Sequence, residues 1–153
     1  MRLKDKVVII TGAGSGIGKE TAMLFASEGA TIIVNDLDEK SGQQTIDEII
    51  SNNGKGLFVK GNVTRSEDVK YLVEEVIERF GRIDVLFNNA GISGVGQLHE
   101  IEPETWEQVF KVNVYGVFLV SKYVIPHMIK QHSGAIINMS SCIAEIGLAD
   151  RAS

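Results

Sequence analysis

Short, continuous runs of apolar residues alternate along the chain with longer segments of helical periodicity. Such runs lie at 7–10, 31–34, 85–87 and 135–137, and a weaker one lies at 56–59. Runs that are apolar throughout, rather than at every second position, are typical of strands buried on both faces of a parallel sheet. We therefore expect four buried strands, and a fifth strand at the weaker run, in one parallel sheet.

Between these runs, apolar residues recur at the three- and four-residue spacing of amphipathic helices. Ser66, with Glu67 and Asp68 behind it, has the pattern of an N-cap before an acidic first turn. The spacing predicts helices over 17–27, 39–51 and 66–80, one that opens at Pro103, and a long, mostly apolar helix over about 114–131.

The resulting order, β-α-β-α-β-α-β-α-α-β, predicts one α/β domain over 1–153 with a doubly wound parallel sheet, that is, a Rossmann fold. We expect the strand order 3-2-1-4-5, with ligands bound at the carboxyl ends of the strands where the winding direction reverses.

Composition narrows the classes of protein to which the chain can belong. The net charge is −5 and the basic residues are scattered, so we expect no nucleic-acid partner. No apolar stretch approaches the roughly 18 residues that suggest a membrane span, and we expect no membrane partner. Cys142 is the only cysteine and the three histidines are scattered, so we expect no intramolecular disulfide, no metal site and a cytoplasmic location.

A glycine-rich turn links the first strand to the first helix. The segment 11–18 reads Thr-Gly-Ala-Gly-Ser-Gly-Ile-Gly. Glycines let backbone N–H groups approach a pyrophosphate, and the helix N-terminus adds partial positive charge at the same place. A plain strand-to-helix turn is the alternative, but strand, loop and helix follow in the order that a dinucleotide site requires. The residues expected to hold pyrophosphate are Gly12, Ser15, Gly16, Ile17 and Gly18.

Asp36 ends the second strand, eighteen residues after Gly18. A carboxylate there can accept hydrogen bonds from the hydroxyls of an adenosine ribose. It would also repel a 2′-phosphate, because two unit charges 4 Å apart interact by about 4 kcal/mol at an effective dielectric near 20. Asp36 therefore favours NAD over NADP.

Several motifs agree in order with those of one enzyme family. The segment 11–18 departs from the general pattern G-x-G-x-x-G but matches T-G-x-x-x-G-x-G, Asn-Asn-Ala-Gly follows the fourth strand at 88–91, and a serine pair closes the fifth strand at 140–141. With these motifs the chain, from Lys6 to Ser153, resembles the short-chain dehydrogenase/reductase family. NADP-preferring members of that family usually place Arg or Lys where this chain has Ser15 and Leu37, which again indicates NAD.

The resemblance assigns further cofactor residues. Relatives usually carry Asp-Val where this chain has Asn62 and Val63, and they bond the adenine amino group with the Asp side chain; the amide oxygen of Asn62 can accept the same bond. Together with the pyrophosphate loop and Asp36, the resemblance implies that the cofactor contacts Leu37, Asn62, Val63, Asn89, Ala90, Gly91 and Val112.

The resemblance also implies catalytic roles for two residues. Ser141 matches the serine that donates a hydrogen bond to the substrate oxygen, and Asn113 matches an asparagine that holds a water in a proton relay. A purely structural Asn113 between helices is the alternative. The family's Tyr-x-x-x-Lys would begin one position past Ser153, so we expect an N-terminal piece of a longer protein, inactive by itself, rather than a short natural protein.

Two functions remain open on these grounds. The first is an oxidoreductase that transfers a hydride between NAD(H) and a secondary alcohol or ketone, and the presence of both Ser141 and Asn113 favours it. The second is a non-catalytic dinucleotide-binding module for redox sensing or scaffolding, which needs neither residue. Relatives pack the 114–131 helix against a symmetry mate, so the resemblance implies a homodimer or homotetramer.

Overall fold

The computed structural model describes residues 1–142. A five-stranded parallel sheet in the order β3-β2-β1-β4-β5 forms its centre, which confirms the predicted fold and strand order. In chain order the elements are β1 (Val7–Thr11), α1 (Gly16–Ser27), β2 (Thr31–Asp36), α2 (Glu39–Ser51), β3 (Lys55–Lys60), α3 (Ser66–Phe80), β4 (Val85–Asn88), α4 (Pro103–Phe110), the π-helical turn η1 (Lys111–Gly116), α5 (Val117–Gln131) and β5 (Ala135–Asn138).

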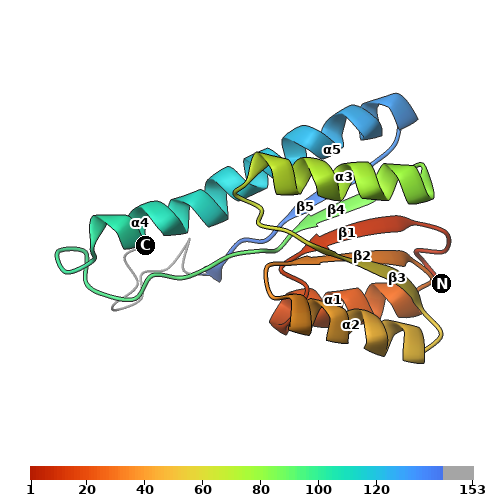
Figure 1. Cartoon of the computed structure of the whole chain (residues 1–153), viewed down its shortest axis with the longest axis horizontal. Helices are drawn as coiled ribbons and strands as arrows, with labels where there is room; N and C mark the ends of the chain where they lie inside the picture. The colour runs from red at the N-terminus through yellow and green to blue at the C-terminus, as the bar shows by residue number, and fades with distance from the viewer. Residues whose placement is uncertain (143–153) are drawn as a thin grey trace.

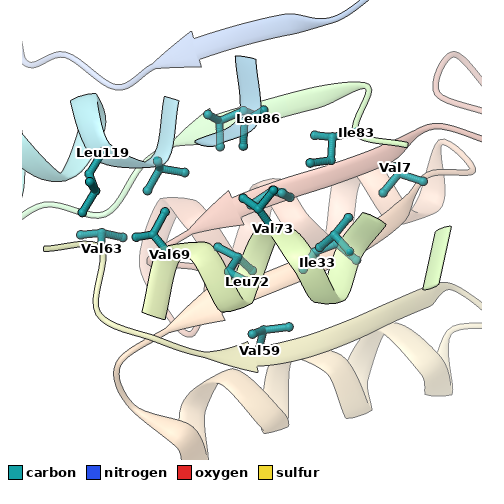
Figure 2. Packing of buried hydrophobic residues seen from close by; sticks show 14 of the residues in the cluster. Val7, Ile33, Val59, Val63, Val69, Leu72, Val73, Ile83, Leu86 and Leu119 are labelled. Carbon is teal, nitrogen blue, oxygen red and sulfur yellow. The ribbon is translucent and has the colours of Figure 1, made fainter. Parts of the chain in front are cut away.

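Helices cover both faces of the sheet, with α1 and α2 on one side and α3 and α5 on the other (Figure 1). Neighbouring side chains of β1 point to opposite faces of the sheet. Ile10 packs in the hydrophobic cluster on the α1–α2 side, and Ile9 packs in the cluster on the α3–α5 side. Figure 2 shows the second cluster, in which Val69 and Leu72 of α3 and Leu119 of α5 gather with strand residues. This double burial is the physical reason why the central strands are apolar throughout.

The outermost strand departs from the expected burial. All four residues of β5 are exposed, and Ile137 keeps 43% of its surface accessible. Within the described residues β5 pairs only with β4, so one of its edges lacks a neighbouring strand. The apolar run predicted the strand itself correctly.

Two helix boundaries also differ from the sequence prediction. Arg65, not Ser66, is the N-cap of α3 and makes no side-chain capping bond; the Ser66 hydroxyl instead lies 2.6 Å from the Tyr123 hydroxyl on α5. The Ser66 hydroxyl therefore makes a tertiary contact with α5 instead of the N-cap hydrogen bond that the local sequence predicted. The long helix also begins earlier than expected, because α4, η1 and α5 follow one another without a break.

Although the sequence holds no uninterrupted apolar run of the length of a membrane span, the continuous helix from Pro103 to Gln131 is 29 residues long and is apolar enough, by length and composition, to cross a membrane. No other helix in the described part of the chain meets that criterion. Its α5 segment buries Leu119, Val120 and Val124 in the core between the sheet and α3. The helix that meets the membrane criterion is therefore also packed, through α5, against the core of the α/β domain.

A buried carboxylate ties strands together at the amino ends of the sheet. Asp84, only 4% exposed, accepts hydrogen bonds from the Val7 N–H at 2.9 Å, from Arg82 Nε at 2.8 Å and from Lys6 Nζ at 3.3 Å. Burial raises the pKa of Asp84, but the hydrogen bonds from Arg82, Val7 and Lys6 outweigh it and hold the pKa below the ordinary 3.8.

We expect the substitution Asp84→Asn to lower the free energy of unfolding at pH 7 by about 2 kcal/mol, because charge-assisted hydrogen bonds are lost. Since the pKa is lower in the folded state, this stabilisation is present above the unfolded pKa near 3.9 and is lost as the pH falls through the folded value. Urea unfolding at pH 7 and pH 3 measures both effects, with the exposed Asp47→Asn as control. An equal deficit at both pH values would contradict the assignment.

Candidate functional site

A cavity of about 520 Å³ opens at the carboxyl ends of the central strands. It collects segments that are far apart in the chain: the loop after β1, the end of β2, the loop after β3, the segment after β4 and the helical stretch at 108–112. Every predicted cofactor residue except Gly16 and Gly18 lines it, namely Gly12, Ser15, Ile17, Asp36, Leu37, Asn62, Val63, Asn89, Ala90, Gly91 and Val112.

The two predicted glycines that do not line the cavity lie at the start of α1, where a side chain would be strained or would clash. Gly16 has a φ of +53°, which favours a residue without a Cβ at the start of α1. A Cβ at Gly18 would overlap the carbonyl oxygen of Gly12 and the side-chain amide of Asn89. Gly18 therefore serves the close approach of α1 to the strand ends.

The segment after β4 is bound directly to the loop. The Thr11 hydroxyl accepts hydrogen bonds from the N–H groups of Asn89 and Ala90, both at 3.1 Å. The Asn89 amide donates in return to the carbonyl oxygens of Thr11 and Gly12, at 3.0 and 3.1 Å. The sequence prediction gave Thr11 no role of its own, although it is the first residue of the matched motif and ends a buried strand.

The N-terminus of α1 has the features of an anion site. Helix α1 begins at Gly16, its N-cap Ser15 is exposed, and no acidic residue lies in its first turn. The first N–H groups of a helix lack partners within the helix, and the helix dipole adds partial positive charge there. The loop can therefore bind a pyrophosphate, because no carboxylate in the first turn of α1 would repel it.

Asp36 is held in place by the backbone on both sides. Its Oδ2 accepts a hydrogen bond from the Gly14 N–H at 2.8 Å, and its Oδ1 accepts one from the Asp38 N–H at 3.0 Å. A carboxylate offers about four lone-pair positions, so both oxygens retain capacity to accept bonds from vicinal hydroxyls. The carboxylate is thus fixed in orientation at the wall of the cavity.

Asn62 uses its amide oxygen within its own loop. That oxygen accepts hydrogen bonds from the Thr64 N–H at 2.9 Å and from the Thr64 hydroxyl at 2.8 Å, which is its usual capacity. In this arrangement the amide hydrogens are the groups that the side chain offers to an incoming base. An aspartate at this position has no such donor.

Asn113 reaches across to the backbone beyond β4. Its Oδ1 accepts from the Ile92 N–H at 2.9 Å, and its Nδ2 donates to the Ile92 carbonyl at 2.8 Å. The residue lies in η1, and π-helical turns of this kind are frequent at functional sites. The side chain therefore positions the segment that carries Ala90 and Gly91.

Ser141 follows β5 and is exposed. It does not line the cavity, whereas Met139, two residues earlier, does. The Met139 N–H donates to the carbonyl of Asn88 at 2.9 Å, which keeps the end of β5 beside β4. The structure thus places Ser141 next to the segment that lines the cavity, and the residues after Cys142 lie outside the described part of the chain.

Sequence reasoning missed other residues of the cavity wall. These are Asn35, Gly61, Ile92, Gln108 and Met139. Asn35 is buried in β2 and its amide donates to the carbonyls of Val59 and Gly61. The available signal for Asn35 was a polar residue inside an apolar strand. Gln108 carried no signal, because polar residues are ordinary in an amphipathic helix such as α4.

Comparison with known proteins agrees with this geometry. The sequence model of a family described as short chain dehydrogenase matches residues 6–153. An oxidoreductase of uncharacterised activity from Thermotoga maritima is 44% identical over 99% of this chain and 59% of its own length. The 3-oxoacyl-[acyl-carrier-protein] reductase FabG of the same organism is 46% identical over 96% of this chain and 60% of its own length.

A third relative and two solved structures extend the comparison. Cyclohexanol dehydrogenase from an Acinetobacter species is 40% identical over 96% of this chain and 59% of its own length. The structure of a Burkholderia phymatum short-chain dehydrogenase/reductase with NAD has a TM-score of 0.94 and 33% identity, over 99% of this chain and 54% of that one. A metagenomic short-chain oxidoreductase with NADP has a TM-score of 0.93 and 31% identity, over 99% of this chain and 69% of that one. The chain therefore spans about 60% of the length of these curated relatives.

Proposed function

Because the chain belongs to the short-chain dehydrogenase family, we propose that it binds NAD and serves an oxidoreductase acting on a secondary alcohol or its ketone. One observation carries the choice of NAD: the Asp36 carboxylate is locked by the Gly14 and Asp38 N–H groups at the cavity wall. The two solved relatives support a nicotinamide dinucleotide, one with NAD and one with NADP.

The residues of the cavity fit such a cofactor from end to end. The N-terminus of α1 receives the pyrophosphate, Asp36 receives the adenosine ribose, and Val63 and Leu37 flank the adenine. The nicotinamide ring, when bound, supplies the hydride acceptor or donor of the reaction. Asn89 and Ala90 lie against the glycine loop and line the cavity, where we place the second ribose.

The chain's own contribution to the chemistry is positioning and hydrogen bonding. In our proposal Ser141 donates a hydrogen bond to the substrate oxygen, where negative charge develops or is neutralised. Asn113 holds the Ile92 segment in place and so fixes the wall of the site. The 153 residues contain no Tyr with a Lys four positions later, so we expect no turnover from them alone.

The decisive experiment is to incubate the full-length protein with NAD⁺ and a panel of secondary alcohols and to follow absorbance of NADH. The panel should include cyclic alcohols, 3-hydroxyacyl thioesters, sugars, steroids and small diols. Turnover of any member with NAD⁺ is the expected result. Binding of NAD⁺ without turnover of any substrate would instead favour the non-catalytic dinucleotide-binding module.

We also propose that the protein forms a homodimer or homotetramer through the face of α4, η1 and α5. Trp106, Phe110, Val114, Tyr115 and Phe118 line an apolar hollow on this face, and Phe118 is 55% exposed. Exposed apolar surface of this kind marks interaction sites. Light scattering on the full-length protein should give at least twice the mass of one chain, and Phe118→Lys should lower that mass; a monomer would contradict the proposal.

A further inference from the structure

A lysine lies beside Asp36 on the neighbouring strand. Lys60 ends β3 and is paired in register with Asp36, which ends β2. Residues paired in a parallel ladder lie side by side on the same face of the sheet. Lys60 also lines a second hollow of about 530 Å³, which shares Leu37, Gly61 and Asn62 with the cofactor cavity. The backbone of Lys60 thus lies one strand spacing from that of Asp36, the residue proposed to select the cofactor.

An ion pair holds the Lys60 ammonium at the N-terminus of α2. Lys60 Nζ lies 3.0 Å from Oε2 of Glu39, the first residue of α2. The position of Glu39 is favourable for a carboxylate, because the N-terminus of a helix carries partial positive charge. The two side chains are 57% and 69% exposed, so the pair is weak and can open. Glu39 therefore decides whether Lys60 is neutralised.

Other charged residues lie at the start of α2 and around the second hollow, and Glu67 is one that lines the hollow. Asp38 caps α2 through the Lys40 N–H and the Ser41 hydroxyl. Arg65, which also lines the second hollow, has its Nε 3.7 Å from Oδ1 of Asp68. Lys40 follows Glu39 on α2 and lines neither hollow. Among the described residues, Lys60 is thus the lysine that is paired in register with Asp36 and also lines the second hollow.

We propose that Glu39 and Lys60 form a second specificity determinant for the 2′ position of the cofactor ribose. While Glu39 holds the Lys60 ammonium, a 2′-phosphate would meet Asp36 without a compensating cation. When the Glu39 carboxylate is removed, Lys60 becomes a partner for that phosphate, and discrimination against NADP weakens although Asp36 is intact. This inference rests on the proposed function, in which Asp36 faces the ribose.

The test is a set of dissociation constants for NAD⁺ and NADP⁺, measured by calorimetry on the full-length protein and its variants. We expect Glu39→Gln to tighten NADP⁺ binding about fivefold and to change NAD⁺ binding less than about twofold. The double variant Glu39→Gln with Lys60→Met should lose that gain. Lys40→Met removes the same charge one residue from Glu39 and, combined with Glu39→Gln, should keep the gain.

The outcomes separate this inference from the proposal on which it rests. If wild type binds NAD⁺ but Glu39→Gln leaves the dissociation constant of NADP⁺ unchanged, only the inference is overturned. It is also overturned if Lys40→Met removes the gain as fully as Lys60→Met, because net charge alone would then explain the effect. If wild type binds neither dinucleotide, the proposed function fails and the inference fails with it.

Discussion

Replacing Asp36 with asparagine is expected to reduce the preference of the protein for NAD⁺ over NADP⁺ by about 100-fold. The carboxylate and a 2′-phosphate about 4 Å apart would repel each other by about 4 kcal/mol at an effective dielectric near 20, and solvent at the open cavity lowers this value. Asparagine keeps the size of the side chain and one acceptor oxygen, but removes its charge. Most of the change should appear as tighter NADP⁺ binding.

The measurement is the ratio of the two dissociation constants in wild type and Asp36→Asn. Asp38→Asn is the matched control, since it removes the same charge two residues away, and Asp38 does not line the cavity. We expect the control to shift the ratio by less than about threefold, as a screened charge outside the site should. If Asp36→Asn shifts the ratio no more than Asp38→Asn does, Asp36 does not select the cofactor.

Replacing Ser141 with alanine is expected to lower kcat of the full-length enzyme by about 100-fold or more, because one hydrogen-bond donor to the reacting oxygen is lost. The dissociation constant of NAD⁺ should stay within about twofold of wild type, since Ser141 lies outside the cofactor cavity. Steady-state kinetics together with calorimetry distinguishes these two effects.

Ser140→Ala is the control for Ser141, because the two serines are adjacent, exposed and at the same strand end. The family resemblance assigns the substrate contact to the second serine, so the first should tolerate alanine with kcat reduced less than about threefold. If the two substitutions reduce kcat equally, or if Ser141→Ala weakens NAD⁺ binding as strongly as it slows turnover, the proposed role of Ser141 is wrong.

The fold was predictable because the apolar runs in the sequence match strands that are buried on both faces in the structure. Ile9 and Ile10 are apolar because the sheet is covered on both faces, and a run of such residues predicts a central strand. The exposure of β5 could not be read from its equally apolar run, because burial depends on neighbours that the run does not specify. The hydroxyl of Ser66 escaped prediction for a similar reason, since Tyr123 lies 57 residues away.

The site was predictable where spacing dictates geometry and less so where partners are distant. Gly12 follows β1 and Asp36 ends the neighbouring β2, so their meeting at one cavity follows from the topology. The loop bonds of Asn62 depend on Thr64, and the ion pair of Lys60 depends on Glu39 across 21 residues. Side-chain pairings of this kind are fixed by rotamers and register, which single-residue patterns do not encode.

The most direct test of the account is a calorimetric titration of the unmodified full-length protein with NAD⁺ and, separately, with NADP⁺. The account predicts that NAD⁺ binds with a dissociation constant at least about tenfold lower than that of NADP⁺, because Asp36 accepts the ribose hydroxyls and repels a 2′-phosphate. Tighter binding of NADP⁺, or no heat of binding from either dinucleotide, would contradict it.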